Sequence, residues 1–154
     1  MQLLAQEEYG LRCLVELSRH PRDRPRTIRE IAEAEGLSPD YAAKLLRELR
    51  RGGLVASTRG AAGGYRLTRA AGEITAWDAI QVLGGSLLPD SFCECHAGQQ
   101  DKCVRSGDCA LRALWRSVDD AVRGVLHGVT LEDLHQTEGS FFDLLARTDM
   151  RSAS

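Results

Sequence analysis

The chain has 154 residues, of which 43% are hydrophobic and 27% charged, and its formal net charge is −2. This length fits one domain, or one domain with an appendage. No run of about 18 apolar residues occurs, which excludes a membrane-spanning helix. The N-terminus lacks the basic start and apolar run of a secretory signal. We therefore expect a cytoplasmic protein, where clustered cysteines more often bind metal than form disulfides.

The charges are unevenly distributed along the chain. Between Arg19 and Arg69 there are 12 Lys and Arg residues against 6 Asp and Glu, whereas the rest of the chain has 8 against 16. A basic segment inside an acidic chain indicates a local anion-binding surface, although a solvated helix face would give the same pattern.

The first predicted helix covers about Leu4 to Arg19, with apolar residues on one face, and is ended by the prolines of HPRDRPR. A second, short helix begins after Thr27. The sequence T-I-R-E fits a capping box with Glu30, and Gly36 marks the end of the helix.

A third helix begins at Ser38-Pro39, an N-cap followed by proline at the first helical position. Its apolar residues recur at helical spacing, and Gly52-Gly53 ends it. Two short helices joined by a tight turn are typical of a helix-turn-helix. The sequence then reads LVAST, RGAAGG and YRLTR, which predicts a β-hairpin. The expected fold is mainly α, a winged helix-turn-helix with a β-hairpin wing and a long C-terminal dimerisation helix.

Beyond the hairpin, Ile74 to Leu83 predicts a further helix, and the cysteine-rich segment after it has no hydrophobic period and indicates a loop. A long helix follows, with Asp108 as its expected N-cap and Gly128 as its end. Its wide apolar stripe needs a partner, and a second copy of the chain is favoured over the chain's own first helix. The stripe consists of Leu111, Leu114, Trp115, Val118, Val122 and Val125.

Four segments are therefore expected. Residues 1–85 form the DNA-binding domain, 86–110 the cysteine-rich loop, 111–135 the dimerisation helix and 136–154 a loosely held tail. The dimerisation segment ends with one expected helical turn, Thr130 to His135.

In a helix-turn-helix the second helix enters the major groove of DNA by its N-terminal turns. Its exposed polar residues can reach phosphates or base edges, and an arginine at the glycine-rich hairpin tip is placed for a minor groove. The basic balance favours DNA over a protein partner as the ligand. The candidate DNA-contacting residues are Thr27, Ser38, Asp40, Tyr41, Lys44, Arg47, Arg59 and Gly60.

Four of the five cysteines lie in the segment FCECHAGQQDKCVRSGDC, with the spacing C-x-C-x7-C-x5-C. Thiolates are soft ligands that select zinc, copper(I) or iron–sulfur clusters. Zinc sites usually bring two close C-x2-4-C pairs, which this segment lacks. The wider gaps suit an iron–sulfur cluster somewhat better than zinc. The fifth cysteine, Cys13, lies on the apolar side of the first helix and is expected in the core.

The segment SPDYAAKLLRELRRGGLVASTRGAAGGYRLTR resembles the Rrf-type family of bacterial transcription regulators, and its most specific part is the motif L-V-x-S-x-R-G-x-x-G-G-Y-x-L at Leu54 to Leu67. The resemblance runs from Met1 to about Leu134. It implies a homodimeric winged-helix regulator that binds an operator in double-stranded DNA. In many members it also implies an iron–sulfur cluster on three cysteines of the loop before the dimerisation helix.

By this resemblance the ligands are Cys95, Cys103 and Cys109, with a 2Fe–2S cluster favoured over 4Fe–4S. IscR-like members add a histidine three residues after the last cysteine, where this chain has Arg112. NsrR-like members instead use a carboxylate from the partner's first helix, a position that Glu8 occupies. Glu8 from the partner subunit is therefore the favoured fourth ligand, followed by Cys93, with His96 also available.

The expected function is that of a transcriptional regulator whose operator binding is controlled by a cluster that senses redox, iron or nitric oxide status. IscR-like recognition helices have glutamate where this chain has Ala43, so the IscR-type operator is not assumed. The alternative is a winged-helix module for protein partners with a structural zinc site. No nucleophile–base pair or phosphate-binding glycine loop before a helix indicates an enzyme.

Overall fold

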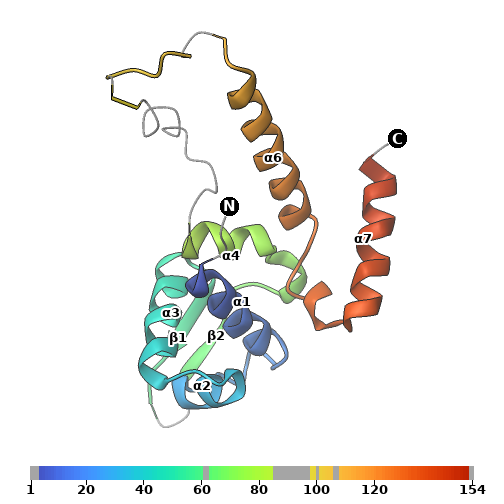
Figure 1. Ribbon diagram of the computed structural model, residues 1–154. Coiled ribbons are helices and arrows are strands. Elements are labelled where there is room, and N and C mark those ends of the chain that lie inside the picture. Colours follow the sequence, from blue (N-terminus) through green and yellow to red (C-terminus); the bar gives the residue numbers. More distant parts are fainter. Residues whose placement is uncertain (1–3, 61–62, 85–97, 100, 106–107, 153–154) are drawn as a thin grey trace.

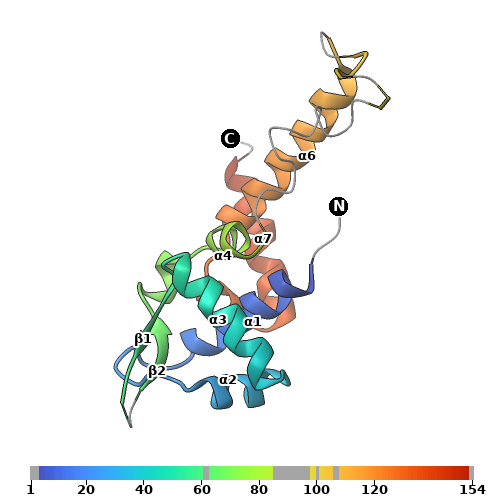
Figure 2. The same ribbon diagram turned by 90° about the vertical axis from the view of Figure 1, so that its left-hand side faces the viewer.

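The computed structural model describes residues 4–60, 63–84, 98–99, 101–105 and 108–152, and the side chains of its last helix as far as residue 146. The described chain has two parts (Figure 1), a compact unit containing α1 to α4 with a hairpin, and two helices, α6 and α7, that project from it. After a 90° turn (Figure 2), α6 still extends away from the compact unit. The fold is mainly helical, as expected, with one two-stranded sheet among the described residues.

Helix α1 spans Ala5–Ser18 and supplies Cys13, Leu14 and Leu17 to the core. Its first turn is closed by the buried Glu7, whose carboxylate accepts a hydrogen bond from the Leu4 backbone N–H at 2.7 Å. α1 packs closely on α4 at Gly10, where a side chain would clash: an added Cβ would lie 2.4 Å from Leu83 Cδ1. The predicted core position of Cys13 is confirmed.

The helix-turn-helix consists of α2, Ile28–Glu35, and α3, Pro39–Arg51. The turn between them uses Gly36 at φ 66°, a left-handed conformation that glycine adopts without strain. Ser38 caps α3 by accepting a hydrogen bond from the Tyr41 backbone N–H at 3.3 Å. The buried face of α3 consists of Ala42, Leu45, Leu46 and Leu49, at the spacing that the sequence predicts.

The wing consists of β1, Val55–Thr58, and β2, Gly64–Leu67, paired antiparallel. The segment before α2 runs alongside β2, where Arg26 and Tyr65 exchange two backbone hydrogen bonds of 2.9 and 2.7 Å. A Cβ on Gly64 would lie 2.5 Å from the Arg26 carbonyl oxygen. Glycine at this position therefore lets the start of α2 lie directly against the wing.

Helix α4 spans Ala76–Leu83 and begins two residues later than expected, after the 3-10 turn η1 at Ala71–Glu73. Thr75 caps α4 and accepts a hydrogen bond from the Asp78 backbone N–H at 3.1 Å. Ile74 was predicted to be helical, but its backbone is extended. Its N–H donates a hydrogen bond to the Ala71 carbonyl, and its carbonyl accepts one from the Leu131 N–H.

Helix α6 spans Ala110–His127 and ends at Gly128, as predicted. Its N-cap is Cys109 rather than the expected Asp108, because the extended backbone of Cys109 already places its carbonyl to accept from the Ala113 N–H at 3.2 Å. The base of α6 is fixed to α4 by the hydrogen bond from the Ala76 N–H to the Val129 carbonyl, 2.8 Å.

The chain ends in the 3-10 turn η2, Asp133–His135, and helix α7, Glu138–Ser152. The expectation of a loosely held tail missed this helix. Phe141, Leu144 and Leu145 recur at i, i+3 and i+4, a helical spacing that the sequence contains. Among the described residues no helix is both long and apolar enough to cross a bilayer.

Candidate functional site

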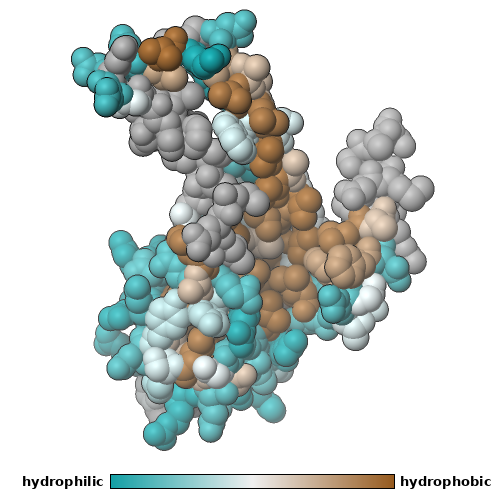
Figure 3. All heavy atoms as spheres, viewed as in Figure 1, coloured by the Kyte–Doolittle hydropathy of each residue, from teal (hydrophilic) through white to brown (hydrophobic). Residues whose placement is uncertain are grey.

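The polar face of α3 lies opposite its buried leucines. Asp40, Lys44 and Arg47 are exposed, and neither basic side chain makes an ion pair within the described part of the chain. Figure 3 shows hydrophilic residues covering the compact unit on the side of α3 and at the end where α2 lies. The structure thus leaves two cations of the recognition helix available to an anionic ligand.

Tyr41 behaves differently from the other candidates on α3. Its ring is half-buried and meets the Tyr9 ring of α1 edge-on, with centroids 6.0 Å apart and planes at 83°. Such a pair fixes the relative position of two helices. Tyr41 therefore holds the recognition helix against α1, and a contact of its hydroxyl with DNA stays a prediction.

The hairpin tip carries Arg59, which is exposed, and Gly60, whose φ of 107° suits only glycine. Gly63 closes the turn by donating its backbone N–H to the Gly60 carbonyl at 2.9 Å. A Cβ on Gly63 would lie 2.5 Å from the Thr58 carbonyl oxygen. Two glycines thus set the course of the chain on both sides of residues 61–62, which lie outside the described residues.

The Thr27 side chain makes hydrogen bonds within the chain, both with Glu30. Its hydroxyl donates to the Glu30 carboxylate at 2.9 Å and accepts from the Glu30 backbone N–H at 3.3 Å, and the Thr27 N–H donates to the same carboxylate at 2.8 Å. This backbone hydrogen bond lowers the pKa of Glu30, followed by the bond from the Thr27 hydroxyl. The capping box that the sequence predicts is confirmed, while a contact of Thr27 with DNA stays a prediction.

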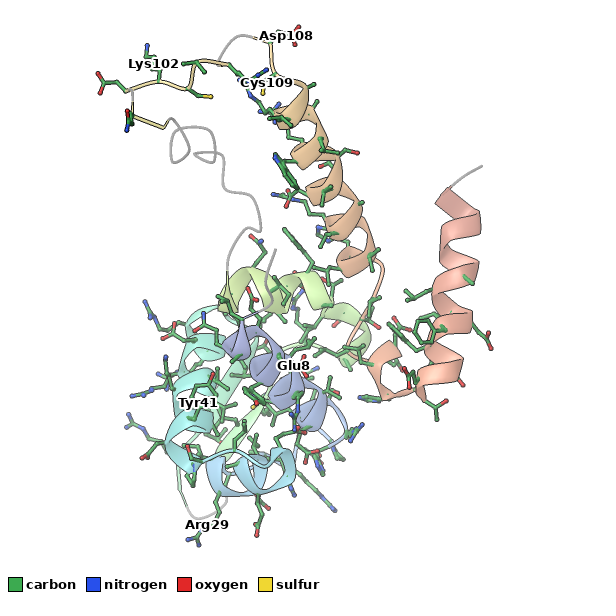
Figure 4. All side chains as sticks on the ribbon, viewed as in Figure 1. Glu8, Arg29, Tyr41, Lys102, Asp108 and Cys109 are labelled. Atoms are coloured by element: carbon green, nitrogen blue, oxygen red, sulfur yellow. The ribbon has the colours of Figure 1, made fainter. Side chains whose placement is uncertain are left out.

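Of the predicted cluster ligands, the structure describes Cys103 and Cys109, both partly exposed and neither in a disulfide. Cys95 and the alternative Cys93 lie outside the described residues, as does His96. Within the described ranges no group of three or more potential metal ligands comes together. Figure 4 shows Cys109 at the end of α6 that points away from the compact unit.

Glu8 lies on α1 in the compact unit and is exposed. Figure 4 places it far from Cys109 of the same chain. Ligation of one cluster by both residues of a single chain would need a large rearrangement, and ligation by Glu8 from a partner stays a prediction.

Two contacts that the sequence analysis missed connect α1 to the helix-turn-helix. Arg12, one turn after Glu8, donates from Nε to the Glu35 carboxylate and from Nη2 to the Glu35 backbone carbonyl, both at 2.8 Å. The bond to the carboxylate raises the pKa of Arg12. The guanidinium also lies 5.3 Å from the centroid of the Tyr9 ring. No local pattern in the sequence predicts this link, because Arg12 and Glu35 lie 23 positions apart on different helices.

Cys13 is chemically distinct from the loop cysteines. It is fully buried in α1, and burial raises the pKa of its thiol to about 12. A protonated core thiol is neither a nucleophile nor a metal ligand.

The apolar stripe of α6 has no cover within the described chain over much of its length. Leu111, Leu114, Trp115 and Val125 are 55, 52, 43 and 50% exposed. Figure 3 shows this hydrophobic band running down α6 toward the base of α7. Side chains of this size in a continuous band indicate a protein–protein contact surface.

Comparisons with known proteins agree with this geometry. The profile of the Rrf2 family, described as an iron-dependent transcriptional regulator, matches residues 3–137. The chain is 37% identical over 134 residues to the HTH-type transcriptional regulator CymR of Bacillus subtilis, covering 87% of this chain and 89% of CymR. It is 30% identical over 149 residues to IscR of Photorhabdus laumondii, covering 97% and 87%.

Two solved structures are similar throughout the same region. The structure of B. subtilis CymR, titled the global cysteine regulator of that organism, aligns with a TM-score of 0.71 and 36% identity, covering 87% of this chain and 95% of CymR. T. potens IscR aligns with a TM-score of 0.68 and 32% identity, covering 87% and 85%. The exposed basic helix, the wing and these matches together place the chain in the Rrf2 family of transcriptional regulators, which bind DNA and are not enzymes.

Proposed function

We propose that this chain is a homodimeric regulator whose affinity for its operator is controlled by an iron–sulfur cluster. The observation that carries the proposal is the pair Cys103 and Cys109, spaced C-x5-C and partly exposed as free thiols where the loop meets α6. Cys95 would complete the thiolate set. The IscR relatives support a cluster in this family. The family also makes DNA a better candidate partner than the protein ligand of the alternative hypothesis.

The donor set fits such a cluster. Thiolates are the usual ligands of iron–sulfur clusters, and both described cysteines lie outside any disulfide at positions that solvent reaches. A carboxylate such as Glu8 of a partner would be a harder ligand than thiolate and would leave one position more easily exchanged. When bound, the cluster would supply redox and ligand-exchange chemistry. The chain's own residues would carry the response to DNA.

Dimerisation would proceed through the α6 stripe. The exposed Leu111, Leu114 and Trp115 lie in the first two turns, next to Cys109, so a partner helix covering them would lie beside the cysteine loop. Pairing of two α6 helices in opposite directions would bring the loop of one chain toward the compact unit of the other. Glu8, which Figure 4 shows far from Cys109 of its own chain, would then be brought toward Cys109 of the partner subunit.

The contacts of α1 offer a route from the loop to the DNA. Glu8 is followed on the same helix by Tyr9, which meets Tyr41 of α3, and by Arg12, which holds the end of α2. A change in the position of Glu8 would therefore act on both helices of the helix-turn-helix. The proposed regulation would thus act through contacts that already connect α1 to both helices of the helix-turn-helix.

The test compares DNA affinity with and without the cluster. Operators are selected from a random duplex pool with anaerobically purified protein, and affinity is then measured for cluster-loaded and cluster-free protein at equal salt. We expect the two affinities to differ at least fivefold, the lower end of the usual range for coupled sites at about 1 kcal/mol. Equal affinities would refute control by the cluster while leaving DNA binding intact.

A cysteine-responsive regulator is the second candidate, favoured by the similarity to the B. subtilis global cysteine regulator. Its signature would be a change in DNA affinity on adding cysteine to iron-free protein. The cysteine-rich loop of this chain favours the cluster as the first hypothesis.

A further inference from the structure

Some of the basic residues between Arg19 and Arg69 form ion pairs or side-chain hydrogen bonds within the chain as the structure describes it, and others do not. Arg26 lies 3.6 and 3.3 Å from the carboxylates of Glu16 and Glu30, and other arginines of the segment pair with Glu48 and Asp78. Seven make no ion pair or side-chain hydrogen bond with the described residues, namely Arg19, Arg24, Arg29, Lys44, Arg47, Arg59 and Arg66. Three of these seven are the expected DNA contacts, and Arg29 is the one on α2.

Arg29 occupies a position that is unfavourable for a cation. It is the second residue of α2 and is exposed. The N-terminal turn of a helix carries partial positive charge, which stabilises anions and destabilises cations. Glu33 lies one turn further on, yet no ion pair forms between them. The Arg29 charge thus has no partner among the described residues that offsets its cost.

The start of α2 lies at the end of the molecule that carries the wing. The two hydrogen bonds between Arg26 and Tyr65 fix this turn against β2. Figures 1 and 2 both show α2 and the hairpin at the same end of the compact unit. In Figure 4 the Arg29 side chain points outward from that end.

We propose that Arg29 binds a phosphate of the DNA backbone beside the wing, a contact that rests on the DNA-binding function of the family. Thr27, the residue of this turn that the sequence indicated, has its hydroxyl in two hydrogen bonds with Glu30. Arg29, two residues on, has a free guanidinium with several donors suited to phosphate oxygens. Phosphate contacts position a protein on the duplex and read no sequence. Arg29 therefore adds affinity rather than specificity.

The test measures binding to a mixed-sequence duplex of about 30 base pairs, where phosphate contacts supply most of the affinity. Titrations by fluorescence anisotropy run between about 50 and 200 mM salt. Arg29→Ala should weaken binding by about three- to tenfold, and the slope of log affinity against log salt should shrink by about 0.9 for each phosphate that the variant no longer neutralises. Arg29→Glu should weaken binding further. Both effects should appear equally on a selected operator.

Arg19→Ala is the control, since it removes the same charge from an exposed, unpaired arginine. Arg19 follows α1, which ends on the side of the compact unit away from α3 (Figure 1). It should leave the salt slope unchanged. Thermal unfolding gives a second readout, because removing a cation from the first turn of α2 should keep or raise the melting temperature, and Arg29→Glu should raise it.

Binding and salt slope of Arg29→Ala equal to those of the unsubstituted chain would overturn the proposal. A loss confined to the selected operator would also overturn it, because it would mean that Arg29 reads bases. If the unsubstituted chain bound no duplex at all, DNA binding itself would fail for this chain, a result distinct from a failure of Arg29 alone.

Discussion

Replacing Arg12 by alanine separates binding of the cluster from its effect on DNA. Arg12 makes two hydrogen bonds of 2.8 Å to Glu35, one to the carboxylate and one to the backbone carbonyl, and lies over the Tyr9 ring. It does not belong to the proposed ligand set. The substitution should therefore leave the cluster in place and loosen the link between α1 and α2.

The size of the effect follows from these contacts. The Arg12 side chain is 41% exposed, so solvent screens its ion pair with Glu35 to about 0.5–1 kcal/mol. The contact with the Tyr9 ring adds about 0.5–1 kcal/mol at an exposed site. We expect a loss of about 1–2 kcal/mol in the free energy of unfolding, which a domain with 5–15 kcal/mol of stability, the approximate usual range, tolerates.

The assay combines denaturant unfolding with DNA titrations of cluster-loaded and cluster-free protein. If the link carries about 1 kcal/mol of the coupling, the ratio of the two DNA affinities should fall about fivefold. Arg69→Ala is the matched control, because Arg69 also holds one carboxylate, that of Asp78, and one backbone carbonyl, that of Glu73. It should lower stability without changing the ratio. A ratio in Arg12→Ala equal to that of the control would refute the route through α1.

Three further predictions concern the wing, the stripe and the core thiol. Arg59→Ala should weaken operator binding by about 1–3 kcal/mol if Arg59 reads a base edge, and unchanged affinity at equal salt would remove the wing from the interface. Trp115→Asp places a charge in the α6 stripe and should yield monomers, or unfolded chain if the protomer is unstable alone, in light scattering with circular dichroism; a folded dimer would show that the stripe packs elsewhere. In cluster-free protein at pH 8, a thiol reagent followed by mass spectrometry should label Cys103 and Cys109 readily and Cys13 only after unfolding, because burial raises the Cys13 pKa to about 12. Fast labelling of Cys13 in the native protein would contradict its buried position. The thiol of the unfolded chain ionises near the ordinary pKa of 9.0. The contribution of Cys13 to the free energy of unfolding should therefore be complete below pH 9 and decline as the pH rises toward 12.

The parts of the fold that local chemistry determines could be predicted from the sequence. The sequence predicts helix starts after Thr27 and Ser38, and the structure has these two residues as the N-caps of α2 and α3. It also predicts the end of α2 at Gly36, which has a left-handed backbone conformation there. The leucines of α3 face the core because their spacing matches the helical period. The glycines around the hairpin tip likewise predict the wing.

Features that depend on tertiary contacts could not be predicted in this way. The edge-on pairing of Tyr41 with Tyr9 joins helices 32 positions apart in the chain, so no local pattern reveals it. The bonds of Arg12 to Glu35 depend on how α1 crosses the end of α2. The N-cap of α6 is Cys109 and not the predicted Asp108. Cys109 makes no capping hydrogen bond with its side chain, so the usual N-cap residue types did not indicate where this helix begins. For α7 a local signal does exist, the helical spacing of Phe141, Leu144 and Leu145, but the sequence analysis did not predict a helix there.

The central claim, that the loop cysteines hold an iron–sulfur cluster, is tested most directly by anaerobic purification followed by visible absorption and by iron, sulfide and zinc analysis. The unsubstituted protein should be coloured and contain iron and acid-labile sulfide in equal amounts. Alanine at Cys95, Cys103 or Cys109 should each abolish the colour, while Glu8→Ala should shift the spectrum or shorten its lifetime in air. A colourless protein that contains zinc, or a Cys103→Ala variant that keeps its full complement of iron and sulfide, would contradict the account.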